Sequence, residues 1–138
     1  MTMLEPEIYL FLFMLFFHVV DDYYLQGILA SLKQRSYWTE HAPDKMYQHD
    51  YIVALVAHAF SWCVSIHIPV IIWWYVYGGF TPIAFLLNFI AQTAIHAIVD
   101  DLKANKRKIN LITDQLVHVL QICVSFVLYY FVWFNNGR

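Results

Sequence analysis

Charged residues, cysteines, glycines and prolines are all scarce in this chain of 138 residues. Asp, Glu, Lys and Arg together make up 13% of it, about half their share in a typical soluble domain. A formal net charge of −2 excludes a nucleic-acid-binding protein with a strongly basic face, and 2 Cys exclude a disulfide scaffold. Apolar residues make up 61% and aromatic residues 19%, which excludes a disordered chain. The composition therefore indicates an integral membrane protein.

Two long stretches contain no charged residue at all, from residue 51 to residue 99 and from residue 115 to residue 137. A membrane-spanning helix needs ~20 mostly apolar residues, whereas a barrel strand needs only ~10 with strict alternation, which these stretches lack. The first stretch is long enough for two helices, and Gly78, Gly79 and Pro82 break it near its middle. We therefore predict an all-α polytopic membrane protein. It forms a single domain over residues 1–138, a four-transmembrane-helix bundle with spans at about 7–30, 49–77, 82–103 and 109–134.

The basic residues predict how the chain is oriented. Seven of the eight Lys and Arg residues lie in the two loops that follow the first and third predicted spans: Lys33, Arg35, Lys45, Lys103, Lys106, Arg107 and Lys108. The positive-inside rule places such loops in the cytoplasm. We therefore expect both termini on the outer side of the membrane.

A short internal repeat relates the two halves of the chain. The pattern H-x-x-x-x-C-V-S occurs from His58 in the second span and again from His118 in the fourth. The pattern H-x-x-x-D occurs from His18 in the first span and from His96 in the third. Two hairpins that run in the same direction predict parallel repeats, related by an axis along the membrane normal.

Four histidines and three aspartates lie inside the predicted spans at a common depth. Three pairs have a spacing of four residues, which places both members of a pair on one face of a helix and lets them bind one metal ion together. With a rise of ~1.5 Å per residue, all seven lie ~5–18 Å inside the cytoplasmic boundary. The predicted metal ligands are His18, Asp22, His58, His96, Asp100, Asp114 and His118. The adjacent Asp21 and Asp101 are expected to support these ligands or to face interfacial water.

Aspartates at this depth need compensation, because a charged side chain at the bilayer centre costs ~2.5–3.5 kcal/mol on insertion scales. We expect no Lys or Arg in the layer, so salt bridges would not neutralise them. Four His and three Asp fit two divalent transition-metal ions, with zinc favoured and Mn, Fe or Ni also compatible. Two other interpretations stay open: protonated aspartates in structural hydrogen bonds, and a proton pathway.

Further polar residues continue the same helix faces: Gln26, Ser65, Asn88, Gln92, Gln121 and Ser125. Hydrogen bonds between helices and support of the metal ligands are both compatible with this pattern. His67, which has no acidic partner at this spacing, is expected to form a hydrogen bond between helices.

The motifs occur in the order His18-x-x-x-Asp22-x-x-Leu25-Gln26, a His in the second span, His96-x-x-x-Asp100-x-Leu102-Lys103 and Asp114-Gln115-x-x-His118. In this the chain resembles a domain family of unknown function found in small phage and bacterial inner-membrane proteins. It more loosely resembles the membrane-bound metal-dependent hydrolases of the YdjM type. The resemblance implies a multi-pass protein of the bacterial inner membrane, a phage or prophage origin, and hydrolase activity.

A metal-dependent hydrolase is the first of three functional hypotheses. Bound metal would activate water, Asp22 or Asp100 would act as general base, and the substrate would be a lipid or lipid-linked (phospho)ester entering from the cytoplasmic side. Lys33, Lys103 and Lys106 either hold its phosphate at the rim or serve only as topology signals. The alternatives are a non-catalytic metal-binding or metal-transporting membrane protein, and a small phage membrane effector. The expected partner is the lipid bilayer, with a homodimer also compatible and no nucleic acid.

Overall fold

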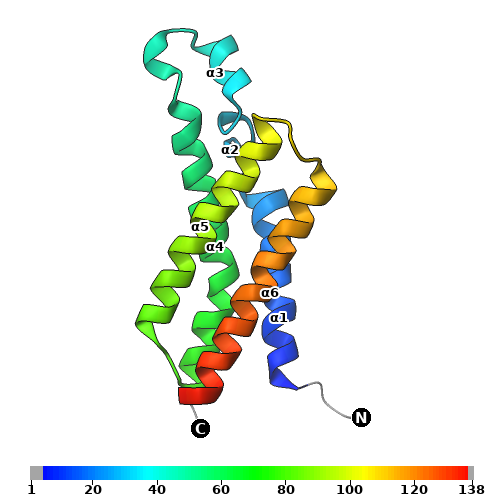
Figure 1. The fold of residues 1–138 in the computed structure, drawn as a ribbon, viewed down its shortest axis with the longest axis vertical. Coiled ribbons are helices and arrows are strands. Elements are labelled where there is room, and N and C mark those ends of the chain that lie inside the picture. Colours follow the sequence, from blue (N-terminus) through cyan, green and yellow to red (C-terminus); the bar gives the residue numbers. More distant parts are fainter. Residues whose placement is uncertain (1–4, 137–138) are drawn as a thin grey trace.

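The structure, a computed structural model, describes residues 5–136, with side chains described as far as residue 132. Four of its helices are long and apolar enough to cross a membrane. They are α1 (Pro6–Val20) with its continuation η1 (Asp21–Leu25), α4 (Asp50–Tyr77), α5 (Pro82–Ala104) and α6 (Leu111–Asn136). This part of the chain contains no strand, so the predicted all-α, four-span architecture is confirmed (Figure 1).

The ends of the spans follow from local sequence. Pro82 stands at the start of α5, where its missing N–H has no helical partner to lose. Gly78 ends α4 with a φ of 78°, a left-handed conformation that suits glycine. The first span ends earlier than predicted, at Leu25, because Gly27 takes a φ of 47° shortly after it. Three short helices then lead to α4: α2 (Leu29–Leu32), α3 (Arg35–His41) and η2 (Lys45–Tyr47).

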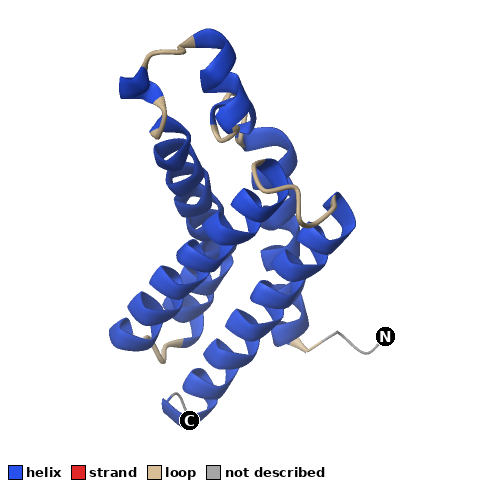
Figure 2. Ribbon diagram, turned by 45° about the horizontal axis from the view of Figure 1, so that its top comes forward, coloured by secondary structure: helices blue, strands red, loops and turns tan. Residues whose placement is uncertain are grey.

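The four long helices form a closed ring of contacts. α1 packs on α4, α4 on α5, α5 on α6 and α6 on α1 (Figures 1 and 2). α4 is the central element: 56% of its most apolar stretch is buried, against 28% or less in the other spans. Large apolar side chains point outward from the ring, for example Phe16, Leu86 and Leu116. Such a surface is suited to lipid rather than to water.

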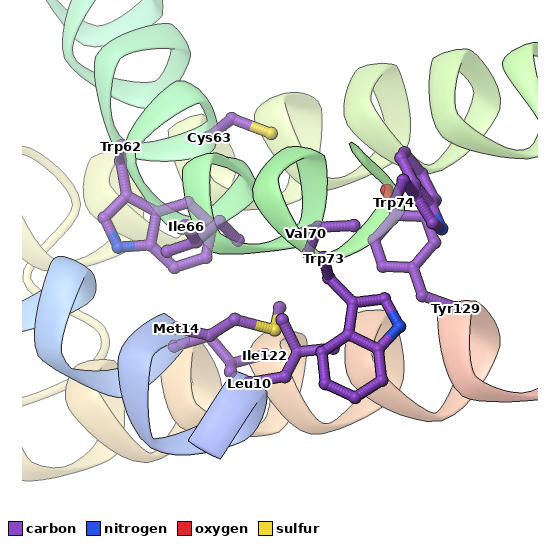
Figure 3. Packing of buried hydrophobic residues seen from close by; sticks show 10 residues of the cluster. All are labelled: Leu10, Met14, Trp62, Cys63, Ile66, Val70, Trp73, Trp74, Ile122 and Tyr129. Carbon is purple, nitrogen blue, oxygen red and sulfur yellow. The ribbon is translucent and has the colours of Figure 1, made fainter. Parts of the chain in front are cut away.

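An apolar cluster fills the half of the bundle where α1 begins and α6 ends (Figure 3). It consists of Leu10, Met14, Trp62, Cys63, Ile66, Val70, Trp73, Trp74, Ile122 and Tyr129. Trp62 is fully buried at the edge of this cluster, and its indole ring stacks on the imidazole of His96 with ring centroids 4.3 Å apart. The polar layer therefore begins where the apolar cluster ends.

The parallel repeat stays a prediction. His58 and His118, which open the two copies of the longer pattern, are both fully buried. Cys63 is buried as well, but Cys123 is partly exposed. The two copies thus place their histidines alike and their cysteines differently.

Candidate metal centre

All seven predicted ligands are buried, none being more than 7% exposed. They come from every span of the bundle, because α1 and η1 supply two, α4 one, and α5 and α6 two each. Side chains that are costly to bury in a membrane thus come from all four spans and lie in one layer.

The first group of ligand atoms belongs to Asp22, His58 and His96, which each offer one atom within 4.8 Å of the other two. His58 Nε2 lies 3.4 Å from Asp22 Oδ1 and 3.4 Å from His96 Nε2. These residues come from η1, α4 and α5. The group therefore ties three different elements to one point.

The second group shares His96 and adds Asp100 and His118, again within 4.8 Å of one another. His118 Nε2 lies 3.5 Å from Asp100 Oδ1, and the rings of His96 and His118 stack with centroids 4.0 Å apart. Asp100 also joins the two groups, because its Oδ2 lies 3.4 Å from His58 Nε2. The five residues thus form one continuous cluster.

These separations are those of metal ligands rather than of hydrogen-bond partners. N–H···O hydrogen bonds usually span 2.7–3.2 Å, whereas two ligands bound to one ion at ~2.0–2.1 Å in tetrahedral geometry lie ~3.3–3.4 Å apart. His118 Nε2, His96 Nδ1, His58 Nδ1 and Asp114 Oδ1 are buried and have no hydrogen-bond partner in the described part of the chain. A buried polar atom without a partner costs ~1–3 kcal/mol. The donor set therefore fits a divalent cation.

A π-helical turn brings two adjacent acids into the bundle together. Asp21 and Asp22 open η1, and both are buried, although neighbours on a regular α-helix point about 100° apart. Single π-helical turns within α-helices are often found at functional sites. The extra residue in the turn is what allows both carboxylates to face α4.

Asp21 has a supporting position that the sequence left open. Its Oδ1 accepts hydrogen bonds from Ser61 Oγ at 2.7 Å and from Ser65 Oγ at 3.0 Å. Its Oδ2 lies 3.7 Å from His58 Nδ1, on the side of the ring opposite the first group. Two serines spaced by four residues on the span that carries His58 are the sequence signal for this contact.

Two predicted ligands lie at the edge of the cluster. His18 Nδ1 accepts a hydrogen bond from Trp62 Nε1 at 2.8 Å and lies 3.5 Å from Asp22 Oδ2. Asp114 Oδ1 lies 3.4 Å from His118 Nε2, while its Oδ2 accepts a hydrogen bond from Gln115. Neither residue belongs to the two groups, although each contacts one of their members.

The expectation that no lysine reaches this layer is wrong. Lys33 is only 6% exposed, and its Nζ donates to Asp100 Oδ2 at 2.6 Å. Lys103 forms a similar ion pair with Asp114. A lysine beyond the end of a span enters the layer because its long aliphatic stem crosses apolar surface and delivers the ammonium group at a distance.

Lys106 behaves differently, because its side chain is 54% exposed. Its Nζ lies 2.8 Å from Asp101 Oδ2, and this hydrogen bond raises the pKa of Lys106. Of the three lysines predicted to hold a substrate phosphate, two are thus paired inside the layer and one is paired at the rim.

The ion pairs change the charge balance of the layer. Four carboxylates, those of Asp21, Asp22, Asp100 and Asp114, are buried there, and two ammonium groups compensate two of them. Two negative charges remain. One divalent ion would neutralise them, and so would two protonated histidines. If a metal supplies the missing charge, the balance is met by one divalent ion rather than the expected two.

Comparisons of the chain with models of protein families, with curated proteins and with solved structures find no match in any of the three. The geometry of the buried cluster is therefore what bears on function.

Proposed function

We propose that the chain is a membrane-embedded metalloprotein, and that it hydrolyses a lipid or lipid-linked (phospho)ester at its metal centre. One observation carries the proposal. Imidazole and carboxylate atoms from all four spans converge at 3.4–3.5 Å in a water-poor layer, and among them His118 Nε2, with Asp114 Oδ1 beside it, lacks any hydrogen-bond partner in the described chain. An unsatisfied cluster of this kind is costly unless a cation completes it.

The first ion is assigned to Asp22, His58 and His96, with Asp100 completing the set through its contact with His58. The second group needs His96 as well, and one imidazole nitrogen binds one ion. A second ion would therefore depend on the other nitrogen of His96, or on Asp114 beside His118. Because one ion already balances the layer, we assign one ion to the resting protein.

Zinc suits this donor set best. Nitrogen and oxygen ligands at tetrahedral separations are typical of zinc sites, and Mn, Fe or Ni accept the same ligands. Cys63 takes no part, since its Sγ donates to the backbone oxygen of Phe89 at 3.3 Å. The absence of a thiolate ligand favours zinc with an exchangeable position over a closed structural site.

A metal ion held here would supply Lewis-acid activation of water. Asp22 and Asp100 are the candidate general bases, because each has a second carboxylate oxygen, Asp22 Oδ2 and Asp100 Oδ1, besides the one that faces His58 Nε2. The centre lies nearer to the loops that the positive-inside rule places in the cytoplasm. A substrate anchored in the inner leaflet of a bacterial membrane is therefore the class that fits, in line with the resemblance to phage and bacterial inner-membrane proteins.

Lys33 and Lys103 would bind the phosphate of such a substrate only if that phosphate replaced the carboxylate with which each lysine is now paired. Lys33 is buried against Asp100, so a phosphate that displaced this pair would enter the cluster itself. Lys106 remains at the rim and more than half exposed, where it reaches a headgroup without rearrangement of the layer. We therefore assign first contact with the substrate to Lys106.

Metal content tests the proposal directly. Protein purified in detergent and dialysed against zinc should retain about one ion per chain by elemental analysis. His96→Ala should lose it, because His96 belongs to both groups. His41→Ala is the matched control, since His41 is exposed on α3 and its ring contacts the Tyr37 backbone oxygen within the same helix. A folded wild-type protein that keeps no metal, or a His96→Ala variant that keeps all of it, would refute the assignment.

Catalysis needs a separate assay. Zinc-loaded protein in vesicles of anionic phospholipid, and with a polyprenyl phosphate ester, should release product at a rate that His96→Ala abolishes and His41→Ala preserves. Metal-loaded protein that hydrolyses neither class would refute the hydrolase and leave a non-catalytic metal-binding protein.

A further inference from the structure

A chain of buried polar side chains runs from the metal centre into the half of the bundle that is otherwise apolar. Its members come from α4, α5 and α6, and all of them are buried: His118, Gln121, Gln92, Asn88, Ser125, Tyr129 and His67. Apolar side chains of similar size would fill the same space without the cost of burying amides. The hydrogen bonds along this chain therefore need an explanation beyond packing.

The direction of the hydrogen bonds is fixed at the far end by a backbone carbonyl. His67 Nδ1 lies 2.6 Å from the Cys63 backbone oxygen, which can only accept, so Nδ1 carries the proton. His67 Nε2 is then the acceptor in the neutral ring. Tyr129, whose hydroxyl oxygen lies 2.6 Å from this nitrogen, must donate to it.

The donor and the acceptor of each following hydrogen bond are determined by the bond before it. The Tyr129 oxygen accepts from Asn88 Nδ2 at 2.8 Å, because its own proton is already used. The other end of the Asn88 amide, Oδ1, then accepts from Gln92 Nε2 at 3.3 Å. Asn88 Nδ2 also donates to Ser125 Oγ at 3.1 Å.

A second backbone carbonyl fixes the direction near the metal centre. Gln121 Nε2 donates to Gln92 Oε1 at 2.8 Å and to the Gln92 backbone oxygen at 3.1 Å. A backbone oxygen only accepts, so the nitrogen of the Gln121 amide must point at Gln92. Gln121 Oε1 is therefore the atom that lies 3.1 Å from His118 Nδ1, and His118 must donate to it.

We infer that Gln121 is a positioning residue that holds His118 in the tautomer with its proton on Nδ1, so that the Nε2 lone pair points at Asp100 and Asp114. His118 Nε2 lies 3.5 Å from Asp100 Oδ1 and 3.4 Å from Asp114 Oδ1. The metal-binding part of this inference rests on the proposed function, whereas the tautomer follows from the hydrogen bonds alone. Histidines that bind metals commonly donate their other N–H to an oxygen in this way, and losing that oxygen typically costs 10–100-fold in metal affinity.

These linked hydrogen bonds explain why the side-chain amide of Gln121 is not flipped, with its nitrogen facing His118. A flipped amide would place two carbonyl oxygens, those of Gln121 and Gln92, against each other and leave the Gln92 backbone oxygen without its donor. Flipping Gln92 as well would pass the same conflict on to Asn88 and then to Tyr129. The far end of the bundle thereby sets the orientation of a ligand in the metal layer.

Gln121→Met tests the inference, because it keeps the length of the side chain and removes the accepting oxygen. With zinc in excess, binding of a second ion at His118, measured by competition with a chromophoric chelator, should weaken about 10–100-fold, whereas the first ion, whose assigned ligands do not include His118, should bind as in the wild type. Gln34→Met is the matched control, since Gln34 is exposed and its side-chain amide donates to the Ala30 backbone oxygen, away from the metal layer. Folded Gln121→Met that binds the second zinc ion as tightly as the wild type would overturn the inference.

A spectroscopic readout separates positioning from stability. In metal-free wild-type protein with ¹⁵N-labelled histidine, two-bond ¹⁵N–¹H correlations should show His118 protonated on Nδ1, with the signal assigned by its loss in His118→Gln. Gln121→Met should give a mixture of tautomers. His118 without a proton on Nδ1 in the wild type would overturn the inference even if zinc binds. If the tautomer is as expected and the wild type binds no metal, the proposed function fails and the positioning by Gln121 stands.

Discussion

Replacing Lys33 by Met should strengthen metal binding and weaken the metal-free protein. Lys33 Nζ lies 2.6 Å from Asp100 Oδ2, which itself lies 3.4 Å from His58 Nε2. The ammonium group is thus no more than about 6 Å from His58 Nε2, a ligand of the first group. A divalent ion at ~6 Å from the ammonium group would be repelled by about 5 kcal/mol at an effective dielectric constant of ~20. Even a quarter of this energy is a tenfold change in affinity, so we expect Lys33→Met to bind zinc at least ~10-fold more tightly.

Without metal, the same substitution leaves Asp100 buried and unpaired. Removing one partner of a buried ion pair typically destabilises a protein by about 3–5 kcal/mol. Chelator-treated Lys33→Met should therefore unfold at a clearly lower temperature than the wild type in the same detergent, and zinc should restore more of its stability. Both quantities are measurable on one preparation, by chelator competition and by thermal unfolding.

Lys106→Met is the matched control, because Lys106 carries the same charge but pairs with Asp101 at the rim and is 54% exposed. Exposed ion pairs contribute ~0–1 kcal/mol, so its zinc affinity should stay within about threefold of the wild type. If Lys33→Met binds zinc as weakly as the wild type or more weakly, Lys33 does not compete with the ion. The assignment of Asp100 to the metal set would then be refuted.

Two further substitutions probe the surroundings of the centre. Asp21→Asn removes the acceptor facing His58 Nδ1 while retaining an oxygen for Ser61, so zinc affinity should fall about tenfold by chelator competition, whereas Asp101→Asn at the rim should leave it unchanged. Trp62→Phe keeps an aromatic ring against His96 but removes the donor to His18, which should cost about 1–3 kcal/mol in thermal unfolding without changing the zinc content. A loss of zinc in Trp62→Phe would place His18 among the ligands.

The spans could be predicted because the bilayer imposes a length on each apolar stretch. The predicted break at Gly78, Gly79 and Pro82 falls between the observed α4 and α5, and the fourth span begins within two residues of its expected start at 109. The common depth of the histidines and aspartates follows from the same constraint, because each span enters at one boundary and rises ~1.5 Å per residue. The distance of a residue from the membrane boundary along its helix can therefore be predicted from the sequence, without knowing how the helices pack.

Contacts across the layer depend on features that linear spacing does not contain. The spacing of four residues groups Asp114 with His118, and these two do lie in contact, yet the ligand group around His118 also draws Asp100 and His96 from another helix. The π-helical turn rotates Asp21 into the bundle, where spacing on a regular helix would direct it away from Asp22. Lys33 lies outside the spans by position, but the reach of its side chain brings its charge inside. Each of these contacts depends on the rotation of a helix about its axis or on the length of a side chain. The depth of a residue along its helix determines neither.

The placement of the centre follows from what surrounds it on two sides. Trp62 closes it toward the apolar cluster, with one face of the indole on His96 and the ring N–H on His18. Lys33 and Lys103 close it toward the loops, each paired with a different carboxylate. Water is thereby kept from the carboxylates on both sides, and electrostatic interactions are stronger where water is excluded. A cation that enters this layer must displace or repel a lysine, so the same residues that make the metal-free protein stable also set how tightly it binds metal.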